Sequence, residues 1–448
     1  MKNEDVKTIT ATVAELSDHA RSVFDSTLWF QSLLDLSYLH QVNPAFAKII
    51  GSYTPSAKTL VRQLKATVND ELEQEVVQDL AEALRRYTAA THANPVIAQL
   101  LQDTETLTAL KVPTTALLAT LIDLMATSAG PRSGSLGTTA SINQLMASLA
   151  TTVNHAPSTI YDPAVGSGLS LLAAREQLPA EQPVTLLGTD IMPSSLLRAK
   201  MLLGSLPQAT TTVSLTVANT LARKDQADIT PVDTIISDPP YSLSWSPSDE
   251  LLEDPRFANF GVLPPKSKAD YAFVLDGLAH LKDDGVMVIQ LPHGVLFRGA
   301  AEGKIRQQLI EANVIDAVIG LPANLNNGVS IPTLLMVLRK KRNREGILFI
   351  DASDDVVKSR IKNTLPEKAI QKIVSTYQAY KNVDSYAHVA SPDEVAAANG
   401  NLNIPRFVDT FTPPAPISLQ ELDQRISTYH DQLADLDQSS AAIMKKYR

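Results

Sequence analysis

The chain has 448 residues, which is too long for one ordinary domain and long enough to bury two or three hydrophobic cores. A hydrophobic fraction of 44% with 19% charged residues excludes a disordered or fibrous chain, and the lack of cysteine excludes disulfides, thiolate metal sites and sulfur nucleophiles. The net charge of −9 is unusual for a protein that grips DNA alone, so either DNA is not the substrate or a partner subunit does the gripping.

Residues 1–130 are predicted to form a helical domain. No basic flank leads into an apolar run at the start, which argues against a secretory signal, and the apolar stretch 113–130 is broken by threonines and Asp123. We therefore expect no membrane span and a cytoplasmic protein. No cluster of catalytic residue types occurs here, which indicates a scaffold or docking domain. With Asn69 as a candidate cap, one helix face is marked at spacings of three and four by Leu72, Val76, Leu80, Leu84 and Tyr87.

Short apolar runs separated by helical stretches begin near Pro157 and predict a parallel βαβ sheet within an α/β domain over residues 131–345. An open doubly wound sheet binds its ligands beyond the carboxyl ends of the strands. Candidate site residues should therefore follow these runs directly. The expected strands are 158–161, 184–187, 234–237, 286–291, 314–319 and 334–338.

The first candidate site is the loop Asp162-Pro163-Ala164-Val165-Gly166-Ser167-Gly168, between an expected strand and the helical run 169–178. Its glycines let the backbone approach a ligand closely, and the following helix presents free N–H groups. A nucleotide-like cofactor fits such a loop, although a structural tight turn explains the glycines equally well. A phosphate-binding P-loop is excluded because no Lys follows the last glycine.

Asp190 follows the next expected strand, roughly 20 to 30 residues after the glycine turn, where a carboxylate accepts hydrogen bonds from ribose hydroxyls. This position favours a ligand that contains adenosine. The purely structural alternative is that Asp190 serves as the N-cap of the expected helix 194–203. The glycine loop and Asp190 by themselves leave nicotinamide-dependent dehydrogenases open.

The motif Asp238-Pro239-Pro240-Tyr241 follows the apolar run 234–237. Two prolines stiffen the chain and remove two backbone donors, which leaves their carbonyls free as acceptors. Hydrogen bonds from an aromatic amine to the Asp238 carboxylate and the Pro239 carbonyl would align its lone pair for attack on a sulfonium methyl group, and Tyr241 can stack on the base. Because adenine N6 is inaccessible in a stacked duplex, such an enzyme must flip its target base.

The pattern weakens after Lys341, and we expect an extension over residues 346–416 that ends in the stiff linker 412–416. Residues 417–448 form a further helical tail, which begins with a capping box of Ser418 and Glu421. Its apolar stripe either contacts a partner protein or packs on the N-terminal helices of its own chain. The stripe comprises Leu419, Leu422, Ile426, Tyr429, Leu433, Leu436, Ile443 and Tyr447, with an interruption at Ser440.

At this point the sequence resembles the modification subunit of type I restriction-modification systems, a gamma-class amino-methyltransferase. The resemblance extends from the helical N-terminal region to the tail. Its most specific blocks are DPAVGSG from Asp162, SDPPYSLSW from Ser237, DPRFANFGVLPPKSKADYAF from Asp254, LPHGVLFRGAAEGKIR from Leu291, VIGLPANLNNGVSIPTLLMVLRK from Val318 and NLNIPRF from Asn401.

The resemblance implies a Rossmann-like class I methyltransferase sheet and an enzyme that methylates adenine N6 in double-stranded DNA with S-adenosylmethionine. It further implies a complex of two such subunits with one specificity subunit, joined in the restricting form by a motor nuclease, and a docking role for the tail. No metal is implied. Residues carried over from the family motifs as cofactor contacts are Asp162, Pro163, Ala164, Gly166, Gly168, Asp190, Asn219 and Phe273, with catalysis assigned to Asp238, Pro239, Pro240 and Tyr241.

Two departures from the family pattern keep alternatives open. The catalytic motif usually begins with Asn, whereas this chain has Asp238, and the block 134–139 lacks the usual aromatic residue and proline. One alternative is a subunit of the same complex that assembles without turning over. Another is an amino-methyltransferase that acts on cytosine N4, RNA or a protein glutamine. Methylation at cytosine C5 is excluded because it requires a thiolate.

Overall fold

The computed structural model describes residues 3–20, 25–52, 56–88, 93–128, 137–222, 224–326, 330–359, 362–410 and 418–446. Its contacts divide the chain into two units, residues 1–409 and 410–448, which are described separately. Several features discussed above lie outside the described residues: positions 134–136, Asn327, Gly328, the linker 412–416, Tyr447 and the side chain of Tyr87.

The N-terminal part of the first unit is helical, as predicted. The expected stripe of α5 packs inward through Val76, Leu80 and Leu84, but the cap differs from the prediction. Asp70, not Asn69, accepts the hydrogen bond from the Glu73 backbone, while the Asn69 N–H donates to the Glu73 carboxylate. The helices are α1 (Asn3–Ala20), α2 (Ser26–Val42), α3 (Pro44–Ile50), α4 (Ala57–Lys65), α5 (Glu71–Thr88), α6 (Ala93–Thr108) and α7 (Thr114–Ser128).

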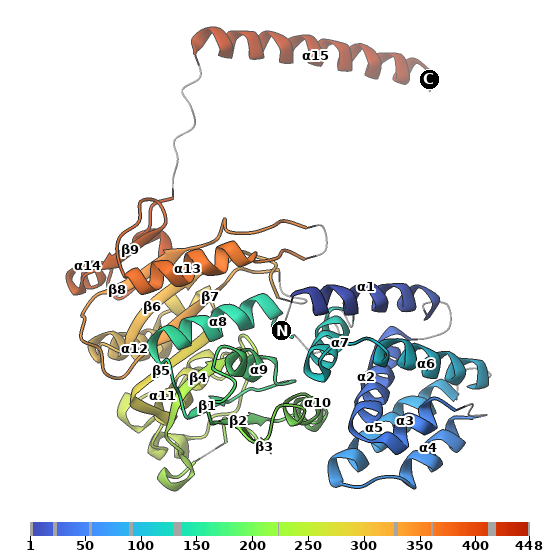
Figure 1. Cartoon of the computed structure of the whole chain (residues 1–448). Helices are drawn as coiled ribbons and strands as arrows, with labels where there is room; N and C mark the ends of the chain where they lie inside the picture. The colour runs from blue at the N-terminus through green and yellow to red at the C-terminus, as the bar shows by residue number, and fades with distance from the viewer. Residues whose placement is uncertain are drawn as a thin grey trace. The chain divides into compact units, whose positions relative to one another are not determined.

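A nine-stranded sheet forms the centre of the same unit, in the order β3-β2-β1-β4-β5-β7-β6-β8-β9 (Figure 1). Strands β1 to β5 run parallel, whereas β7 pairs antiparallel with both β5 and β6 and β9 pairs antiparallel with β8. The strands are β1 (Thr159–Asp162), β2 (Val184–Asp190), β3 (Thr211–Val217), β4 (Val232–Ser237), β5 (Leu281–Pro292), β6 (Ile315–Gly320), β7 (Thr333–Leu338), β8 (Ile347–Asp351) and β9 (Ala387–Ala390).

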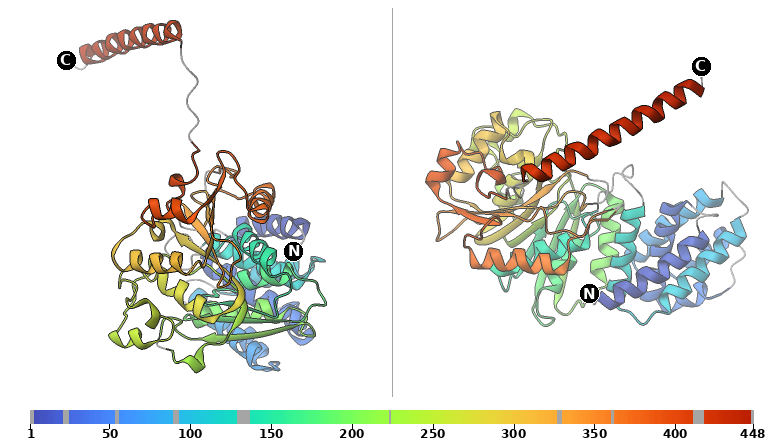
Figure 2. Two further views of the ribbon diagram at one scale, coloured as in Figure 1. Left: turned by 90° about the vertical axis from the view of Figure 1, so that its left-hand side faces the viewer. Right: turned by 90° about the horizontal axis from the view of Figure 1, so that it is seen from above.

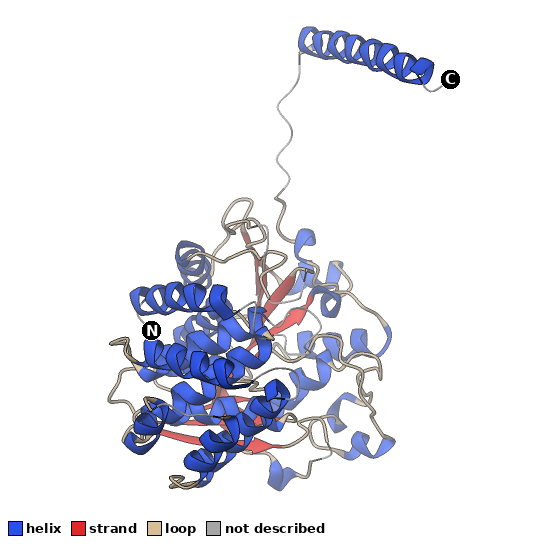
Figure 3. Ribbon diagram, turned by 90° about the vertical axis from the view of Figure 1, so that its right-hand side faces the viewer, coloured by secondary structure: helices blue, strands red, loops and turns tan. Residues whose placement is uncertain are grey.

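Helices cover both faces of this sheet (Figure 3), because alternate residues of each buried strand point to opposite sides. Ile236 of β4 packs with one layer of helices, and its neighbour Ile235 packs with the other. The first layer contains α8 (Ala140–Val153), α9 (Leu169–Glu176), α10 (Pro193–Gly204) and α13 (Glu367–Ala379), and the second contains α11 (Asp270–His280) and α12 (Ala300–Glu311).

The N-terminal helices and the sheet domain share one continuous core. Helix α10 contacts both α5 and α7, which lie beside it in Figures 1 and 2. An ion pair of 2.9 Å joins Lys200 of α10 to Glu75 of α5. The helical domain is therefore attached to the sheet on the side of strands β2 and β3.

All six strands expected from the sequence are present, within a few residues of the expected bounds. The expectation of an all-parallel sheet is wrong for Leu334–Leu338: no helix links β6 to β7 in the described residues, so the chain returns antiparallel. The segment after Lys341 adds β8 and β9 to the sheet and also contains α14 (Pro392–Ala397).

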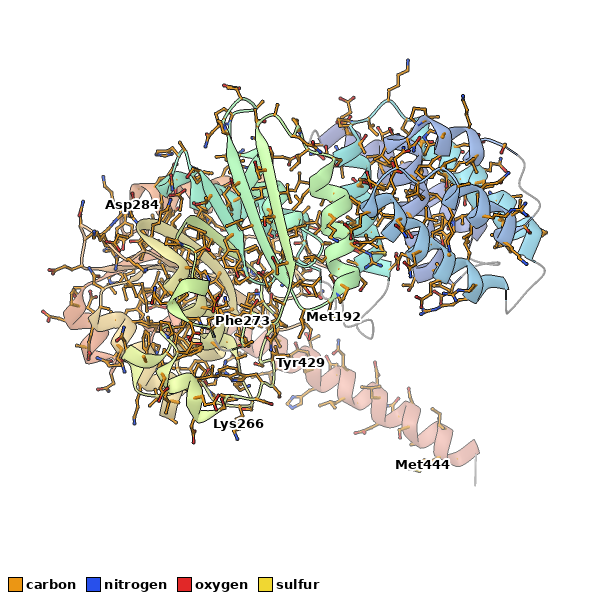
Figure 4. All side chains as sticks on the ribbon, turned by 90° about the horizontal axis from the view of Figure 1, so that it is seen from below. Met192, Lys266, Phe273, Asp284, Tyr429 and Met444 are labelled. Carbon is orange, nitrogen blue, oxygen red and sulfur yellow. The ribbon has the colours of Figure 1, made fainter. Side chains whose placement is uncertain are left out.

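The second unit contains one helix, α15 (Leu419–Lys446). The backbone N–H of Glu421 donates to the Ser418 hydroxyl, which confirms half of the predicted capping box. The predicted stripe is exposed, with 62% of Tyr429 and 65% of Leu436 accessible, and Tyr429 and Met444 project from the helix in Figure 4. An apolar stripe on a solvated helix is a surface that another helix can cover.

Candidate active site

The glycine loop joins β1 to α9 and is held by its own polar groups. Asp162, at the end of β1, is buried, and its carboxylate accepts hydrogen bonds from the Ala164 backbone at 2.9 Å and the Ser170 hydroxyl at 2.5 Å. Burial raises the pKa of Asp162 to about 6, although both of these hydrogen bonds lower it. The carboxylate therefore fixes the turn and leaves a negative charge beneath it at neutral pH.

The two glycines of the loop are needed for different structural reasons. Gly166 has φ +53°, and a Cβ atom placed there would meet nothing within 4 Å, so its backbone faces open space. Gly168 has φ +85° and lies against Ala199 and Leu203 of α10, where an added Cβ would come within 3.2 Å of both. Gly166 thus exposes backbone to a ligand, whereas Gly168 permits close helix packing.

Asp190 ends β2 and closes onto the glycine loop. One carboxylate oxygen accepts from the Gly166 backbone at 2.9 Å, and the other accepts from the Met192 backbone at 2.7 Å. Ile191 and Met192 directly follow it and are 61% and 54% exposed. A half-buried carboxylate beside two exposed apolar side chains can hold the hydroxyls of a ribose and cover an attached purine.

Asn219 lies in the loop that follows β3, between two anchored neighbours. The Ala218 backbone donates to the carbonyl of Asp190, and the Thr220 hydroxyl donates to the carbonyl of Pro163 at 2.5 Å. The Asn219 side chain itself accepts from the Leu221 backbone and is exposed. The loops after β1, β2 and β3 therefore meet at one edge, as predicted for site residues that follow strands.

A buried arginine fixes this third loop. Arg256 is fully buried and donates to the backbone carbonyls of Thr220 and Ala222, while it pairs with Asp254 at 2.7 Å and with Asp276 of α11 at 2.8 Å. The guanidinium thus connects the loop after β3 to α11. The block that begins at Asp254 has a structural role that the sequence patterns did not reveal.

Asp238 follows β4 and is surrounded by donors. The Thr138 hydroxyl donates to one of its carboxylate oxygens at 2.5 Å, and the Tyr241 hydroxyl donates to the other at 2.6 Å. With its amide nitrogen directed at Asp238, Gln290 of β5 donates to both oxygens at 3.2 and 3.3 Å, and its oxygen accepts from Asn326 at 3.0 Å. The carboxylate is held in one orientation by donors from three parts of the chain, and Asn326 supports one of them.

The environment of Asp238 changes its acidity. Burial raises the pKa of Asp238 to about 7, although the hydrogen bonds from Thr138 and Tyr241 lower it, and the charge of Asp162 raises it further. Burial and the charge of Asp238 raise the pKa of Tyr241 well above its usual value, so its hydroxyl remains a donor. Within the described residues, the Pro239 carbonyl accepts no hydrogen bond from the protein.

The residues predicted for the site divide into two groups. The structure brings together Asp162, Gly166, Asp190 and Asp238, since Asp162 is electrostatically coupled to the other two carboxylates and Asp190 is bonded to the glycine turn. Phe273 is 5% exposed within α11 and belongs mainly to the core on that face of the sheet. It is labelled in Figure 4.

The sequence analysis missed three residues around Asp238. Gln290 is a fully buried amide within the otherwise apolar run 286–291 of β5, which is a signal that could have identified it. Thr138 and Asn326 lie in loops whose polar side chains carry no comparable signal. Thr138 belongs to the block 134–139, which was noted only for its departure from the family pattern.

The acceptors present suit a nucleoside with a positively charged group. Gly166 leaves open space above its backbone and Asp190 offers carboxylate oxygens. Asp162 and Asp238 lie at the carboxyl ends of the neighbouring strands β1 and β4, and burial raises their pKa values to about 6 and about 7. Carboxylates of this kind favour a cationic centre such as a sulfonium. In the described residues no group of three potential metal-ligating side chains occurs, and no helix there combines the length and hydropathy needed to cross a bilayer.

Comparison with known proteins points to one family. Residues 118–413 match the family described as N-6 DNA Methylase. The MpnII methylase subunit of a type I restriction enzyme from Mycoplasma pneumoniae is 32% identical over 330 residues, covering 70% of this chain and 60% of that protein. The MjaVII methylase subunit from Methanocaldococcus jannaschii is 35% identical over 202 residues, covering 42% of this chain and 35% of that protein. The chain thus spans less than two thirds of these curated relatives.

A solved structure supports the same similarity. The methyltransferase subunit of a type I restriction-modification system from Streptococcus thermophilus is 29% identical, with a TM-score of 0.71, covering 90% of this chain and all of that one. A structure from a study of type I complex assembly has a TM-score of 0.65 at 12% identity, which shows the fold alone. The fold is that of the class I methyltransferases, as the sequence predicted.

Proposed function

Because the chain belongs to the N-6 DNA methylase family, we propose that it is the modification subunit of a type I restriction-modification complex and methylates adenine N6 in DNA. The observation that carries this proposal is the position of two acceptors, the Asp238 carboxylate and the Pro239 carbonyl, at the same sheet edge as the open glycine turn. Cofactor contacts are assigned to the glycine loop, Asp190, Asn219 and Phe273.

S-adenosylmethionine, the cofactor of this family, supplies the methyl group on a sulfonium. Asp190 would bind the ribose hydroxyls, Ile191 and Met192 would cover the adenine, and the open space at the Gly166 backbone would allow close approach. The two N–H groups of the flipped target amine donate to Asp238 and to the Pro239 carbonyl. These hydrogen bonds would localise the nitrogen lone pair and orient it toward the methyl group. Transfer would leave a neutral thioether on the cofactor, and the methylated nitrogen would lose its extra proton to water.

In this proposal Tyr241 both donates a hydrogen bond to Asp238 and stacks on the target base. In the absence of substrate its hydroxyl occupies one carboxylate oxygen of Asp238 and also accepts a hydrogen bond from Asn326 at 2.5 Å. When the base enters, the ring is proposed to turn and stack on it. Gln290 and Thr138 keep the carboxylate oriented during this exchange.

The proposal is tested by methyl transfer with the specificity subunit present. Duplexes containing the recognition sequence are compared, one with methylatable adenines and one in which only cytosines can be modified. We expect label from S-adenosylmethionine on adenine alone. Label on cytosine would contradict the choice of substrate. No transfer together with no calorimetric binding of S-adenosylmethionine would instead support a subunit that assembles without turning over.

The methylation rate is expected to rise with pH. The ionised Asp238 is the stronger acceptor for the N–H of the amine, and because its pKa is about 7 the ionised fraction increases about tenfold from pH 6 to pH 8. Asp238→Asn replaces the carboxylate with an amide oxygen that accepts without titrating. The variant should retain turnover and lose this pH dependence in kcat/KM profiles. If log kcat/KM rises equally with pH in both proteins, Asp238 is not the group whose ionisation causes the rise.

We further propose that α15 docks on helices of the specificity subunit, that a second copy and a motor nuclease join the complex, and that it acts on DNA in the cytoplasm. The exposed stripe on α15 supports the docking role. Deletion of residues 418–448 should prevent co-purification with the specificity subunit while the remaining chain still binds S-adenosylmethionine. Recovery of an intact complex after this deletion would refute the docking role.

A further inference from the structure

A second candidate binding surface lies beyond the carboxyl end of β5. It is a groove of about 810 Å³ between the loop 297–299 with the start of α12 on one side and residues 398–406 on the other. The lining includes Phe297, Lys304, Gln307 and Arg406. This groove is separate from the glycine loop and is not used by the proposed mechanism.

The two walls of the groove are fixed to each other by buried polar contacts. Arg306 is 5% exposed and donates to the backbone carbonyls of Gly400 on one wall and of Val295 and Arg298 on the other, at 2.8 to 3.0 Å. The Leu402 backbone also donates to the carbonyl of Leu296. Because these bonds do not depend on a ligand, the groove is preorganised.

The charge of the groove opposes that of the whole chain. None of its lining residues is acidic, although the chain has a net charge of −9. Lys304 and Arg406 are exposed, and across the described ranges neither side chain has a hydrogen bond or ion pair. Half of Phe297 is exposed beside them. Unpaired cations next to an exposed aromatic ring form a surface that suits nucleic acid.

The groove is mechanically connected to the catalytic loop. Arg298, between the lining residues Phe297 and Gly299, pairs with Asp270 of α11 at 3.0 Å. The same Asp270 accepts from the backbone of Ser242, which directly follows Tyr241, at 2.7 Å. Strands β4 and β5 are parallel neighbours, so the catalytic loop and the loop 293–299 leave the sheet at the same edge.

We infer that this groove binds backbone phosphates of the DNA substrate close to the flipped adenine, with Lys304 and Arg406 as the phosphate contacts. The inference rests on the proposed function and adds to it a site at which this acidic subunit itself binds DNA. Electrostatic contact to phosphate carries no sequence information, which is consistent with recognition by another subunit.

The test measures DNA affinity of the assembled complex between 50 and 200 mM salt, by fluorescence anisotropy with a duplex that contains the recognition sequence and one that does not. The double variant Lys304→Gln/Arg406→Gln should lower the slope of log affinity against log salt by about 1 for each cation. At about 0.1 M salt this corresponds to roughly eightfold weaker binding for each lost contact, on both duplexes. Each single variant should show half of the change in slope.

The matched control is Lys58→Gln/Arg62→Gln on α4, which removes the same charge from exposed side chains of the helical domain. An equal slope for the groove variant and this control would overturn the inference. Loss of the specificity subunit from the groove variant would also overturn it and assign the groove to a protein partner. The groove is tested by DNA affinity, whereas the proposed function is tested by methyl transfer. Failure of the wild-type complex to methylate adenine would therefore count against the proposed function and not against the groove.

Discussion

Replacing Asp238 with alanine is expected to reduce the kcat of methyl transfer by at least about 10²–10³-fold, the range found when one preorganised hydrogen-bonding group is removed from an active site. The variant removes the acceptor that holds one N–H of the target amine. Its cofactor contacts remain, because Asp190 and the Gly166 backbone belong to other loops. Binding of S-adenosylmethionine, measured by calorimetry, should therefore be largely unchanged.

The matched control is Asp283→Ala, which removes a carboxylate whose side chain is 65% exposed and paired with Lys341 on the surface. This variant should methylate at the wild-type rate. Turnover of Asp238→Ala at the rate of this control would exclude Asp238 from the mechanism, whereas loss of cofactor binding together with turnover would indicate a structural role.

Arg256→Met is expected to cause the largest loss of stability. The guanidinium is buried between Asp254 and Asp276, whose side chains are likewise inaccessible. Burial raises the pKa of Asp254, but the hydrogen bonds from Arg256 and from the Lys224 backbone lower it to below its usual value. Removing one partner from a buried ion pair leaves uncompensated charge and costs about 3–5 kcal/mol.

Urea denaturation measures this loss as a lower free energy of unfolding. The control Arg86→Met breaks a surface pair with Glu82, in which both side chains are more than half exposed, and should cost less than about 1 kcal/mol. If Arg256→Met unfolds at the urea concentration of the control, the network does not support the loop after β3. The loop contains Asn219, so the stability loss should be accompanied by weaker binding of S-adenosylmethionine.

Most of the strands that the sequence revealed are buried for most of their length, although β2 alternates between buried and half-buried residues and the buried strand β8 was missed. The run 334–338 is continuously apolar, the run 234–237 has two isoleucines at its centre, and both runs are buried in the structure. Strand β3 was missed because it forms one edge of the sheet and alternates threonine and serine with apolar residues, so its pattern is weaker. The antiparallel direction of β7 depends on the connection that precedes it, which strand periodicity does not encode.

In the candidate site, too, the residues found from the sequence lie in contiguous motifs, and the residues missed are brought in from distant parts of the chain. The loops at Asp162 and Asp238 were identifiable because each is a contiguous motif after a strand. Thr138 lies 100 residues before Asp238, and their hydrogen bond exists only because α8 packs against β4 and β5. The raised pKa of Asp238 could not be predicted either, since it depends on burial by side chains from several elements.

The most direct test of the account is a structure of the complex with DNA and the demethylated cofactor S-adenosylhomocysteine. We expect the ribose hydroxyls on Asp190, and the N6 atom of a flipped adenine at hydrogen-bonding distance from Asp238 and the Pro239 carbonyl. The gap between the N6 atom and the sulfur should have room for the methyl group that is transferred. A methyl carbon placed on the sulfur would then lie about 3–3.5 Å from N6. A cofactor bound away from the glycine loop, or a target base that does not reach residues 238–241, would contradict the account.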